Sequence, residues 1–334
     1  MPASRPSRCD NRRVSSDTSL ARGPAGDPVI VVAGEALVDL LVRADGEIVP
    51  VAGGSPYNMV RAIARLGVPA AWVGGLSTDR FGRLLEAGLA EDGVDLAAVQ
   101  RTDLPTTLAL AELGADGSAS YRFYTAETSA PAVHPGPLAG IVGDRVRAVA
   151  TGSLGLVLEP IGSTLEAVVT AVPADRLVML DPNARPSITR DPAAWRARMA
   201  RMMARADIVK ASTEDLDYLR PGDPVDAAAW VLAQGPAVVL VTDGSRPVRV
   251  LTPSGTELVP APPVEVVDTV GAGDTFGGAF LACLVHDGVG PPDLVDPAVA
   301  LRAARFAVRA SAAVCARAGA NPPTLAELGG WQAA

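Results

Sequence analysis

The chain has 334 residues and a net charge of −8, with 49% hydrophobic and 20% charged residues. This composition is typical of a well-packed globular protein, and the length suits one large α/β domain or two domains. The negative charge argues against a general surface for nucleic acids or anionic membranes, and no apolar run is long enough to span a membrane. We therefore expect neither nucleic acid nor membrane among the partners of this protein.

Cysteine and histidine are both rare, with three and two residues respectively. Cys9, Cys283 and Cys315 lack the spacing of metal ligands, so we expect a reducing compartment, the cytoplasm, without disulfides. The two histidines, His134 and His286, disfavour a His-rich zinc site and a Ser-His-Asp triad. The composition thus argues against zinc enzymes and serine hydrolases.

Residues 1–27 are rich in Arg, Ser, Pro and Gly and show no periodic apolar positions, which predicts a disordered tail. The tail lacks the apolar segment of a secretory signal. Order begins at 29–34, a continuous apolar run typical of a buried parallel strand. Asp39 follows among apolar neighbours, near the strand end where open α/β sheets bind ligands. A carboxylate in such surroundings is either paired or functional, and we favour a ligand contact.

A glycine turn at 53–58, with the sequence Gly-Gly-Ser-Pro-Tyr-Asn, leads into a predicted helix over 58–66. Asn58 is expected either to cap this helix or to hydrogen-bond a ligand hydroxyl. A strand over 70–74 and a helix over 80–92 form the next unit.

Two runs rich in β-forming residues, both within 105–125, flank a glycine-containing turn and predict a β-hairpin. A hairpin does not belong to a series of βαβ units, so these strands should lie outside the main sheet. Together with strands near 40–51, they predict a small lid sheet over the ligand site. Such a lid excludes water during transfer chemistry. Tyr121 on the hairpin either contacts the ligand or seals the lid.

Strands and helices then alternate along the chain. Strands are expected at 146–151, 177–181, 208–210, 238–242, 248–252 and 257–260, and helices at 161–172, 193–205, 226–234 and 297–317. Alternating units of this kind predict an α/β fold with a doubly wound, mostly parallel sheet flanked by helices on both faces.

A strand over 264–267 and the turn Gly271-Ala272-Gly273-Asp274 precede a helix that runs to about His286. Free N–H groups in such a glycine turn, at the positive end of a helix, form a site for an anion such as phosphate. The helix dipole favours the ionised form of Asp274, which makes this side chain a suitable proton acceptor. An anion site beside a fixed base is what phosphoryl transfer to an alcohol requires.

Two other interpretations of this turn remain open. It can be a structural connection in which Asp274 only caps the helix. Its glycines, Gly271, Gly273 and Gly277, also form a relaxed dinucleotide pattern, which would indicate a nicotinamide oxidoreductase. The position near the C-terminus, and the lack of an acidic strand end about 20 residues later, disfavour the dinucleotide interpretation.

Taken together, residues 29–323 resemble the ribokinase-like (PfkB) carbohydrate kinase family. Residues 268–276 are similar to the C-terminal signature of that family, and residues 53–58 are similar to its N-terminal glycine signature. The resemblance implies a ribokinase-like fold in one kinase domain, residues 28–323, followed by a C-terminal tail at 324–334. It also implies transfer of the γ-phosphoryl group of ATP to a sugar hydroxyl.

The resemblance assigns roles to individual residues. Asp274 is similar to the catalytic base of the family, which takes the proton from the acceptor hydroxyl. The backbone of Gly271, Ala272 and Gly273 is similar to the anion hole for the transferred phosphoryl group. The residues at the positions where the family binds sugar hydroxyls are Asp39, Gly54 and Asn58.

On the nucleotide side, the resemblance assigns ATP contacts to Lys210, Thr242, Gly244 and Ser245, and also to Gly271 and Gly273. Pro247 stands where a second glycine is usual in the segment that begins at Thr242.

Two metal ions are implied as well. The segment 210–214 is similar to the family segment that acts on Mg²⁺ through water, with Glu214 present and Ala211 in place of an asparagine. Glu214 can equally be a glutamate at a helix start. Asp268 and residues 316–320 are similar to a monovalent-cation loop, which implies K⁺ as a further ion.

The run at 181–186, Asp-Pro-Asn-Ala-Arg-Pro, is similar to bacterial fructokinases, with Asn183 and Arg185 as sugar contacts. We therefore expect a fructokinase. Arg185 equally suits an acidic sugar such as 2-keto-3-deoxygluconate, and a nucleoside kinase is the other alternative among enzymes. A non-catalytic sugar sensor on the same fold is the alternative outside enzymes. Small lid sheets often pair between subunits, so a homodimer through the lid is a further expectation.

Overall fold

The computed structural model describes residues 27–43, 45–113, 119–135 and 141–332. The predicted disordered tail lies outside these residues, except for Asp27. The turn of the predicted hairpin and the last two residues of the chain lie outside them too. No helix in the described part of the chain is long and apolar enough to cross a membrane.

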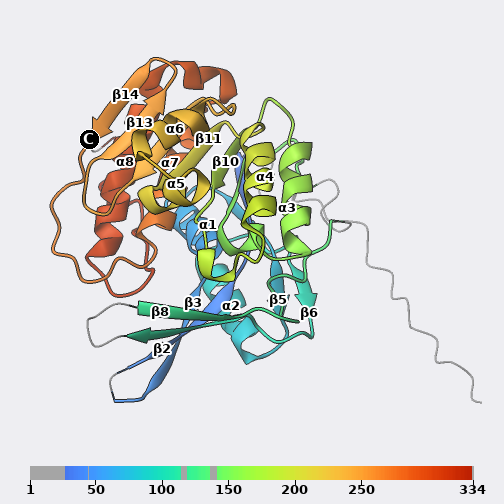
Figure 1. Ribbon diagram of the computed structural model, residues 1–334. Helices are drawn as coiled ribbons and strands as arrows, with labels where there is room; N and C mark the ends of the chain where they lie inside the picture. Colours follow the sequence, from blue (N-terminus) through green and yellow to red (C-terminus); the bar gives the residue numbers. More distant parts are fainter. Residues whose placement is uncertain (1–26, 44, 114–118, 136–140, 333–334) are drawn as a thin grey trace, which may run out of the picture.

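The main sheet has eight strands in the order β14-β13-β12-β11-β10-β9-β1-β4 (Figure 1). The strands are β1 (Val29–Ala33), β4 (Ala70–Val73), β9 (Val146–Gly152), β10 (Leu177–Asp181), β11 (Ile208–Ser212), β12 (Val238–Thr242), β13 (Val248–Thr252) and β14 (Gly255–Val259). All pairs from β4 to β12 are parallel, whereas β13 and β14 pair antiparallel at one edge. The sheet confirms the predicted fold class.

Helices cover both faces of this sheet. Helices α1 (Ser55–Arg65), α2 (Arg80–Glu91), α7 (Ala272–His286) and α8 (Pro297–Cys315) contribute to the core on one face, and α3 (Ile161–Ala171), α4 (Pro192–Met203), α5 (Thr213–Leu219) and α6 (Pro224–Leu232) to the core on the other. Short 3-10 turns are η2 (Ser153–Leu156), η3 (Pro186–Ile188) and η4 (Pro291–Val295). Successive residues of β1 alternate between the two cores, as the period of a strand requires, so every residue of this strand is buried.

The predicted lid is a separate four-stranded sheet in the order β3-β2-β7-β8. Its strands are β2 (Leu37–Val42), β3 (Ile48–Gly53), β7 (Leu108–Leu113) and β8 (Ala119–Tyr124), and a further pair is formed by β5 (Gly75–Ser77) and β6 (Gln100–Thr102). The lid lies below the main sheet in Figure 1, at the carboxyl end of β1. The main sheet therefore presents its strand ends to the inner face of the lid.

The predicted strand over 264–267 is wrong. The chain between β14 and α7 pairs with no strand, and Val264, Val266 and Val267 are exposed. The N–H of Val267 donates instead to the carbonyl of Cys315, 2.8 Å away, at the end of α8. Valine favours strands, but a strand forms only where a neighbouring strand completes the ladder.

Two helices also differ from the prediction. Helix α1 begins at Ser55, three residues earlier than expected, because Gly54 adopts the N-cap position and Pro56 suits the first turn. Helix α5 was expected only through the alternative interpretation of Glu214 as a glutamate at a helix start. It begins with a capping box in which Ser212 and Asp215 exchange hydrogen bonds, a signal that is visible in the sequence as Ser-x-x-Asp.

The segment after α8 folds back onto the main domain. The N–H of Leu325 donates to the carbonyl of Arg65 over 3.2 Å, and the Trp331 ring stacks 4.4 Å from the ring of His286. The described part of the predicted C-terminal tail therefore packs against α1 and α7, and the domain boundary at residue 323 stays a prediction.

Candidate active site

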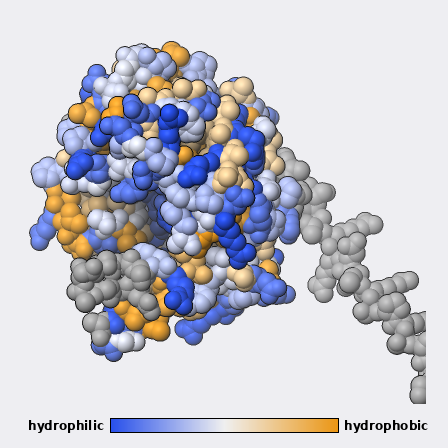
Figure 2. Space-filling view, viewed as in Figure 1, coloured by the Kyte–Doolittle hydropathy of each residue, from blue (hydrophilic) through white to orange (hydrophobic). Residues whose placement is uncertain are grey.

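A cavity of about 580 Å³ lies between the lid and the carboxyl ends of the main strands. Figure 2 shows the surface hollowed where the lid meets the main domain. Ten residues predicted for the site line this cavity: Asp39, Gly54, Asn58, Tyr121, Asn183, Arg185, Lys210, Gly271, Gly273 and Asp274. They come from the lid, from α1, from the strand ends of β10 and β11, and from the start of α7. Residues far apart in the chain are thus brought into one cavity.

Asp274 is held by the first turn of α1, directly after the glycine turn. The Oγ of Ser55 donates to Oδ1 of Asp274 over 2.6 Å, and Nδ2 of Asn58 donates to Oδ2 over 2.8 Å. Asp274 lies in the first turn of α7 and is only 8% exposed. These two hydrogen bonds fix the direction in which the carboxylate faces the cavity, so the two glycine segments form one unit.

The turn before α7 needs glycine at its first position. Gly271 is the N-cap of α7 and adopts a left-handed conformation with φ 77°. A Cβ atom there would lie 2.7 Å from the Cβ of Ala320. The close approach places the N–H groups of the turn at the positive end of α7, which suits an anion.

Burial raises the pKa of Asp274 above its ordinary value, while hydrogen bonds from Ser55 and Asn58 and the charge of Lys210 act in the opposite direction. The net direction differs from the sequence prediction, in which the helix dipole was expected to dominate. Desolvation of a carboxylate can shift its pKa by several units, more than a helix dipole does. The result is a more basic carboxylate in a fixed orientation, which suits proton acceptance.

Lys210, the only lysine of the chain, forms a buried ion pair at the floor of the cavity. Its Nζ donates to Oδ2 of Asp181 over 2.8 Å, and a Cβ atom on Gly273 would lie 3.0 Å from the same nitrogen. Burial is the largest influence and lowers the pKa of Lys210. The charges of the nearby carboxylates, Asp181 first, and the hydrogen bond to Asp181 together outweigh burial, so the pKa is raised. A permanent positive charge therefore lies against the glycine turn.

Further residues of the cavity lining carry polar groups suited to hydroxyls. Burial raises the pKa of Asp39 to about 6, although the charge of Arg185 lowers it. Nη1 of Arg185 donates to Oδ1 of Asn183 over 2.6 Å, and Asn183 is held in a left-handed conformation with φ 36°. Oδ1 of Asn58 is buried and has no partner among the described residues. A ligand hydroxyl can satisfy this oxygen.

Polar residues of the cavity that were not predicted for the site include Ser55, Glu35 and Ser153. Glu35 is 1% exposed, accepts a hydrogen bond of 2.9 Å from the N–H of Gly155, and has its pKa raised by burial to about 7. Its signal in the sequence was the same as that of Asp39, an acid among apolar residues just beyond a buried strand. Ser55 was visible only as part of the glycine turn.

Known proteins match this chain along most of its length. The family model described as pfkB family carbohydrate kinase matches residues 28–327. The chain belongs to this family. The assignment confirms the resemblance found in the two glycine segments.

Several relatives of this pfkB kinase carry a specific name. A fructokinase from Rhizobium leguminosarum bv. trifolii is 38% identical over 264 residues, which are 78% of this chain and 80% of that protein. The crystal structure of a fructokinase with bound ATP from Xylella fastidiosa has a TM-score of 0.82 and 30% identity, over 90% of this chain and 96% of that chain. A fructokinase from Vibrio cholerae O395, in fructose, ADP and calcium ion bound form, has a TM-score of 0.78 and 26% identity over 90% and 97% of the two chains.

The residues predicted to bind ATP through the segment at Thr242 do not line the cavity of this pfkB kinase. Thr242 ends β12, and Gly244 and Ser245 lie exposed in the connection to β13, with Gly244 in a left-handed conformation at φ 53°. They lie along the same edge of the main sheet as Lys210, because β11 and β12 are adjacent and parallel. Their role in ATP binding stays a prediction.

Glu214 is exposed and lines a separate depression with Arg196 and Tyr218. The capping box of α5 explains this position, because it turns the neighbouring Asp215 inward, where Asp215 accepts from the N–H of Ala184 over 2.6 Å. The described residues contain no group of three or more His, Cys, Asp or Glu side chains that could hold a metal ion. The role of Glu214 toward Mg²⁺ stays a prediction.

Asp268 connects the glycine turn to the segment after α8. Its Oδ1 accepts from the N–H of Val270 over 3.0 Å, and its Oδ2 accepts from the N–H of Gly319 over 2.8 Å. The segment 316–320 thereby lies beside the turn, as predicted for a cation loop. The bound ion itself stays a prediction.

Proposed function

We propose that this pfkB kinase transfers the γ-phosphoryl group of ATP to a hydroxyl of free fructose. The observation that carries the proposal is the carboxylate of Asp274, oriented by Ser55 and Asn58 at the start of α7, inside a cavity lined with polar groups. The named relatives support both substrates, since one solved fructokinase holds ATP and another holds fructose and ADP.

In this mechanism the acceptor hydroxyl donates its proton to Asp274, and the hydroxyl oxygen attacks the γ-phosphorus of ATP as the bond to ADP breaks. The N–H groups of residues 271–273 and the ammonium of Lys210 stabilise the negative charge of the transferred group. Oδ1 of Asn58 accepts from a second sugar hydroxyl. The lid carries Asp39 and Tyr121 over the acceptor and limits access of water, which would otherwise compete as an acceptor.

ATP would extend from the glycine turn toward Thr242, Gly244 and Ser245. Mg²⁺ prefers oxygen ligands and is commonly held by substrate phosphates with one or two carboxylates. The described residues offer no ready cage of carboxylates, which fits an ion held mainly by the phosphates of ATP, with Glu214 acting through water. The ion would neutralise charge on the phosphates, and K⁺ beside Asp268 would strengthen the anion site.

The charges of the cavity favour a neutral acceptor. Glu35, Asp39 and Asp274 all lie in the field of Arg185, so this guanidinium is already compensated. An acidic sugar such as 2-keto-3-deoxygluconate would add a fourth carboxylate to this set. The cavity therefore supports fructose over a sugar acid.

A nucleoside is the second candidate acceptor. Tyr121 and Phe123 both line the cavity, with stacked rings whose centroids lie 6.2 Å apart. Aromatic rings of this kind could stack on a nucleoside base as well as on the face of a sugar.

The oriented Asp274 argues against a non-catalytic sensor, because a protein that only binds the sugar does not need a positioned base.

One assay tests these alternatives. ADP release would be measured with ATP, Mg²⁺ and a panel of fructose, glucose, 2-keto-3-deoxygluconate and a nucleoside. Fructose should give the highest kcat/KM. A higher value with another acceptor would replace the fructose assignment, and sugar binding by calorimetry without ADP release would favour the sensor.

Two further proposals concern the oligomeric state and the location of the protein. Leu41 and Tyr121 lie on the same face of the lid, on either side of Ala111, and both are exposed. This exposed apolar surface supports a homodimer through the lid, in which a second copy would bury it. Light scattering would test the dimer. Cys283 and Cys315 are free, which supports a reducing compartment such as the cytoplasm.

A further inference from the structure

The loop that follows β9 forms one wall of the cavity. Its first turn, η2, places Ser153 and Leu154 in the cavity lining, and both are buried. Ser153 adopts a left-handed conformation with φ 61°, which is unfavourable for a residue with a side chain. Such a conformation persists only when contacts around it hold it in place, so the anchors of η2 decide the shape of this wall.

The inner anchor is Glu35. Its carboxylate accepts from the N–H of Gly155, in the middle of η2, over 2.9 Å. A Cβ atom on Gly155 would lie 3.0 Å from Cδ1 of Leu165 and 3.3 Å from Oε2 of Glu35. Glycine at this position lets η2 lie close against both the carboxylate and helix α3.

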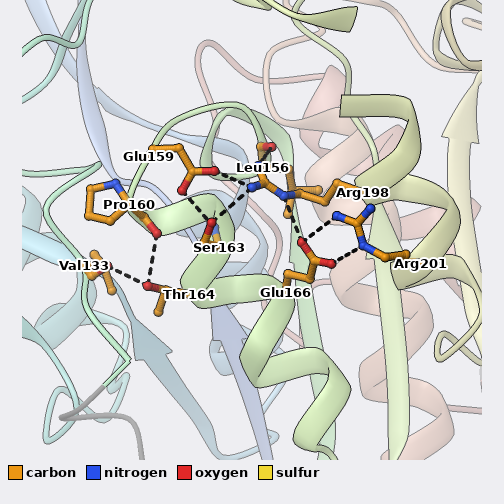
Figure 3. A network of polar contacts seen from close by, with 9 residues as sticks. All are labelled: Val133, Leu156, Glu159, Pro160, Ser163, Thr164, Glu166, Arg198 and Arg201. Carbon is orange, nitrogen blue, oxygen red and sulfur yellow. Dashed lines mark hydrogen bonds and ion pairs between the residues drawn. The ribbon is translucent and has the colours of Figure 1, made fainter. Parts of the chain in front are cut away.

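The outer anchor is Arg198 on α4, which Figure 3 shows reaching toward the loop. Its Nη1 donates to the carbonyl of Leu156, the last residue of η2, over 2.9 Å. Its Nη2 donates to Glu159 further along the loop, and its Nε donates to Glu166 of α3 over 3.2 Å. A Cβ atom on Gly162 would lie 2.4 Å from Nη1, so glycine leaves the space through which the guanidinium passes.

Arg201, one turn further along α4, offers a comparison inside the same network (Figure 3). It donates to Glu166 over 2.5 and 3.1 Å, and among the described residues it has no hydrogen bond to the loop. Arg198 is 14% exposed and Arg201 is 58% exposed at the side chain. The two arginines share an acidic partner, and they differ in whether they reach η2.

We propose that Arg198 is a positioning residue for the acceptor: it fixes the end of η2 through the carbonyl of Leu156 and so keeps Ser153 and Leu154 where the acceptor contacts them. The proposal rests on the proposed function, in that the acceptor binds in this cavity. Arg198 lies outside the cavity lining, so its effect on the acceptor passes through the loop. In the proposed function ATP binds at other strand ends, so the KM for ATP should not depend on Arg198.

The test compares Arg198→Gln with Arg201→Gln, using the acceptor that the unmodified enzyme phosphorylates best. Arg198→Gln should raise the KM for the acceptor about tenfold, the scale expected for loss of a charge-assisted hydrogen bond, while kcat and the KM for ATP change less than about twofold. Arg201→Gln should leave all three constants within about twofold. Thermal unfolding of both variants reports any general loss of stability.

The proposal is overturned if the acceptor KM of Arg198→Gln equals that of Arg201→Gln, or if the KM values for acceptor and ATP rise together. Arg198→Lys is the second variant, for the case in which Arg198→Gln fails to fold. A lysine has one ammonium in place of the planar guanidinium fork and cannot reproduce the separate contacts of Nη1, Nη2 and Nε, so η2 should be held less firmly and the acceptor KM should rise about threefold. An unchanged acceptor KM in a folded Arg198→Lys enzyme also overturns the proposal. An unmodified enzyme that phosphorylates no sugar would instead refute the proposed function.

Discussion

The ammonium nitrogen of Lys210 lies 2.8 Å from Oδ2 of Asp181, in an ion pair whose two side chains are only 6% and 1% exposed. The other oxygen of Asp181, Oδ1, is buried without a hydrogen-bond partner among the described residues. A buried pair of this kind is an unreliable source of stability, because desolvation offsets the attraction between the charges. Because Lys210 lies against Gly273, we propose that its charge serves the anion site.

Lys210→Met should lower kcat about 10²-fold or more, the usual cost of losing one donor to a developing charge. It should also lower the free energy of unfolding by about 3–5 kcal/mol, because Asp181 is left as an unpaired buried carboxylate. Steady-state kinetics and denaturant unfolding measure the two effects.

The double variant Lys210→Met with Asp181→Asn separates the two effects. Removing the charge of residue 181 should restore most of the lost stability without restoring kcat. A double variant with near-normal turnover would show that Lys210 acts only as the partner of Asp181.

Asp274→Asn should lower kcat by about 10² to 10⁴, the range found for loss of a positioned general base. The amide keeps the size of the carboxylate, and Ser55 can still donate to its oxygen, so the acceptor should bind within about threefold of its normal affinity. Calorimetric titration with fructose and a single-turnover assay measure the two quantities. Normal turnover in Asp274→Asn would remove this residue from the mechanism.

Ser55→Ala should change the pH dependence of the reaction. Ser55 donates to the charged form of Asp274 over 2.6 Å, so its hydroxyl lowers the pKa of that carboxyl. Without the hydroxyl the pKa rises further, and the acid limb of kcat/KM should move to higher pH by on the order of one unit. A pH–rate profile that coincides with that of the unmodified enzyme would contradict the role of Ser55. Ser187→Ala, at another serine of the cavity lining, is the matched control.

The sequence predicted the centre of this site because parallel strands end at a common edge. Asn183 follows β10, Asp39 follows β1 at a short distance, and Lys210 ended the strand that was predicted over 208–210. Their convergence could therefore be expected from the order of strands and helices along the chain. The hydrogen bond from Ser55 to Asp274 joins residues 219 positions apart, and no local pattern reports such a contact. It depends on the approach of α1 to α7, which is a tertiary contact.

The other differences between prediction and structure arose where the outcome depends on tertiary contacts that a local sequence pattern does not report. The valines near 264–267 have strand propensity, yet strand formation requires a neighbouring strand. The resemblance assigned Mg²⁺ to Glu214, and the capping box of Ser212 turns its neighbour Asp215 inward while Glu214 stays exposed. The role of Glu214 toward Mg²⁺ stays a prediction. The direction of the pKa shift of Asp274 depends on burial, which a sequence reports only in general terms.

Acceptor binding should weaken at low pH through Asp39. Burial raises the pKa of Asp39 to about 6, so protonation begins within the working range of the enzyme. A protonated carboxyl accepts hydrogen bonds poorly, and the KM for fructose should therefore rise as the pH falls below 6, by about tenfold for each unit once most of the carboxyl is protonated. In Asp39→Asn the KM should be high and independent of pH between about 5 and 8, a range that brackets the shifted pKa. A KM that still rises on acidification in Asp39→Asn would assign the titration to another group.

Glu35 should make the ligand-free protein less stable as the pH rises. Burial raises its pKa from 4.5 to about 7, so between these values the folded state binds more protons than the unfolded state. The free energy of unfolding then falls with increasing pH across this window, and the loss is complete above about pH 7.

The side chain of Gln has no such titration and can still accept a hydrogen bond from the N–H of Gly155. Relative to the unmodified protein, Glu35→Gln should therefore gain about 1–3 kcal/mol between about pH 5 and pH 8. Urea unfolding at both pH values measures this gain. Glu166→Gln is the control, because hydrogen bonding from Arg201 holds the pKa of Glu166 below its usual range. Glu166 stays ionised in both states throughout this window, so the stability of Glu166→Gln relative to the unmodified protein should not change between the two pH values. A Glu35→Gln variant whose relative stability is as independent of pH as that of Glu166→Gln would show that the pKa of Glu35 is not raised.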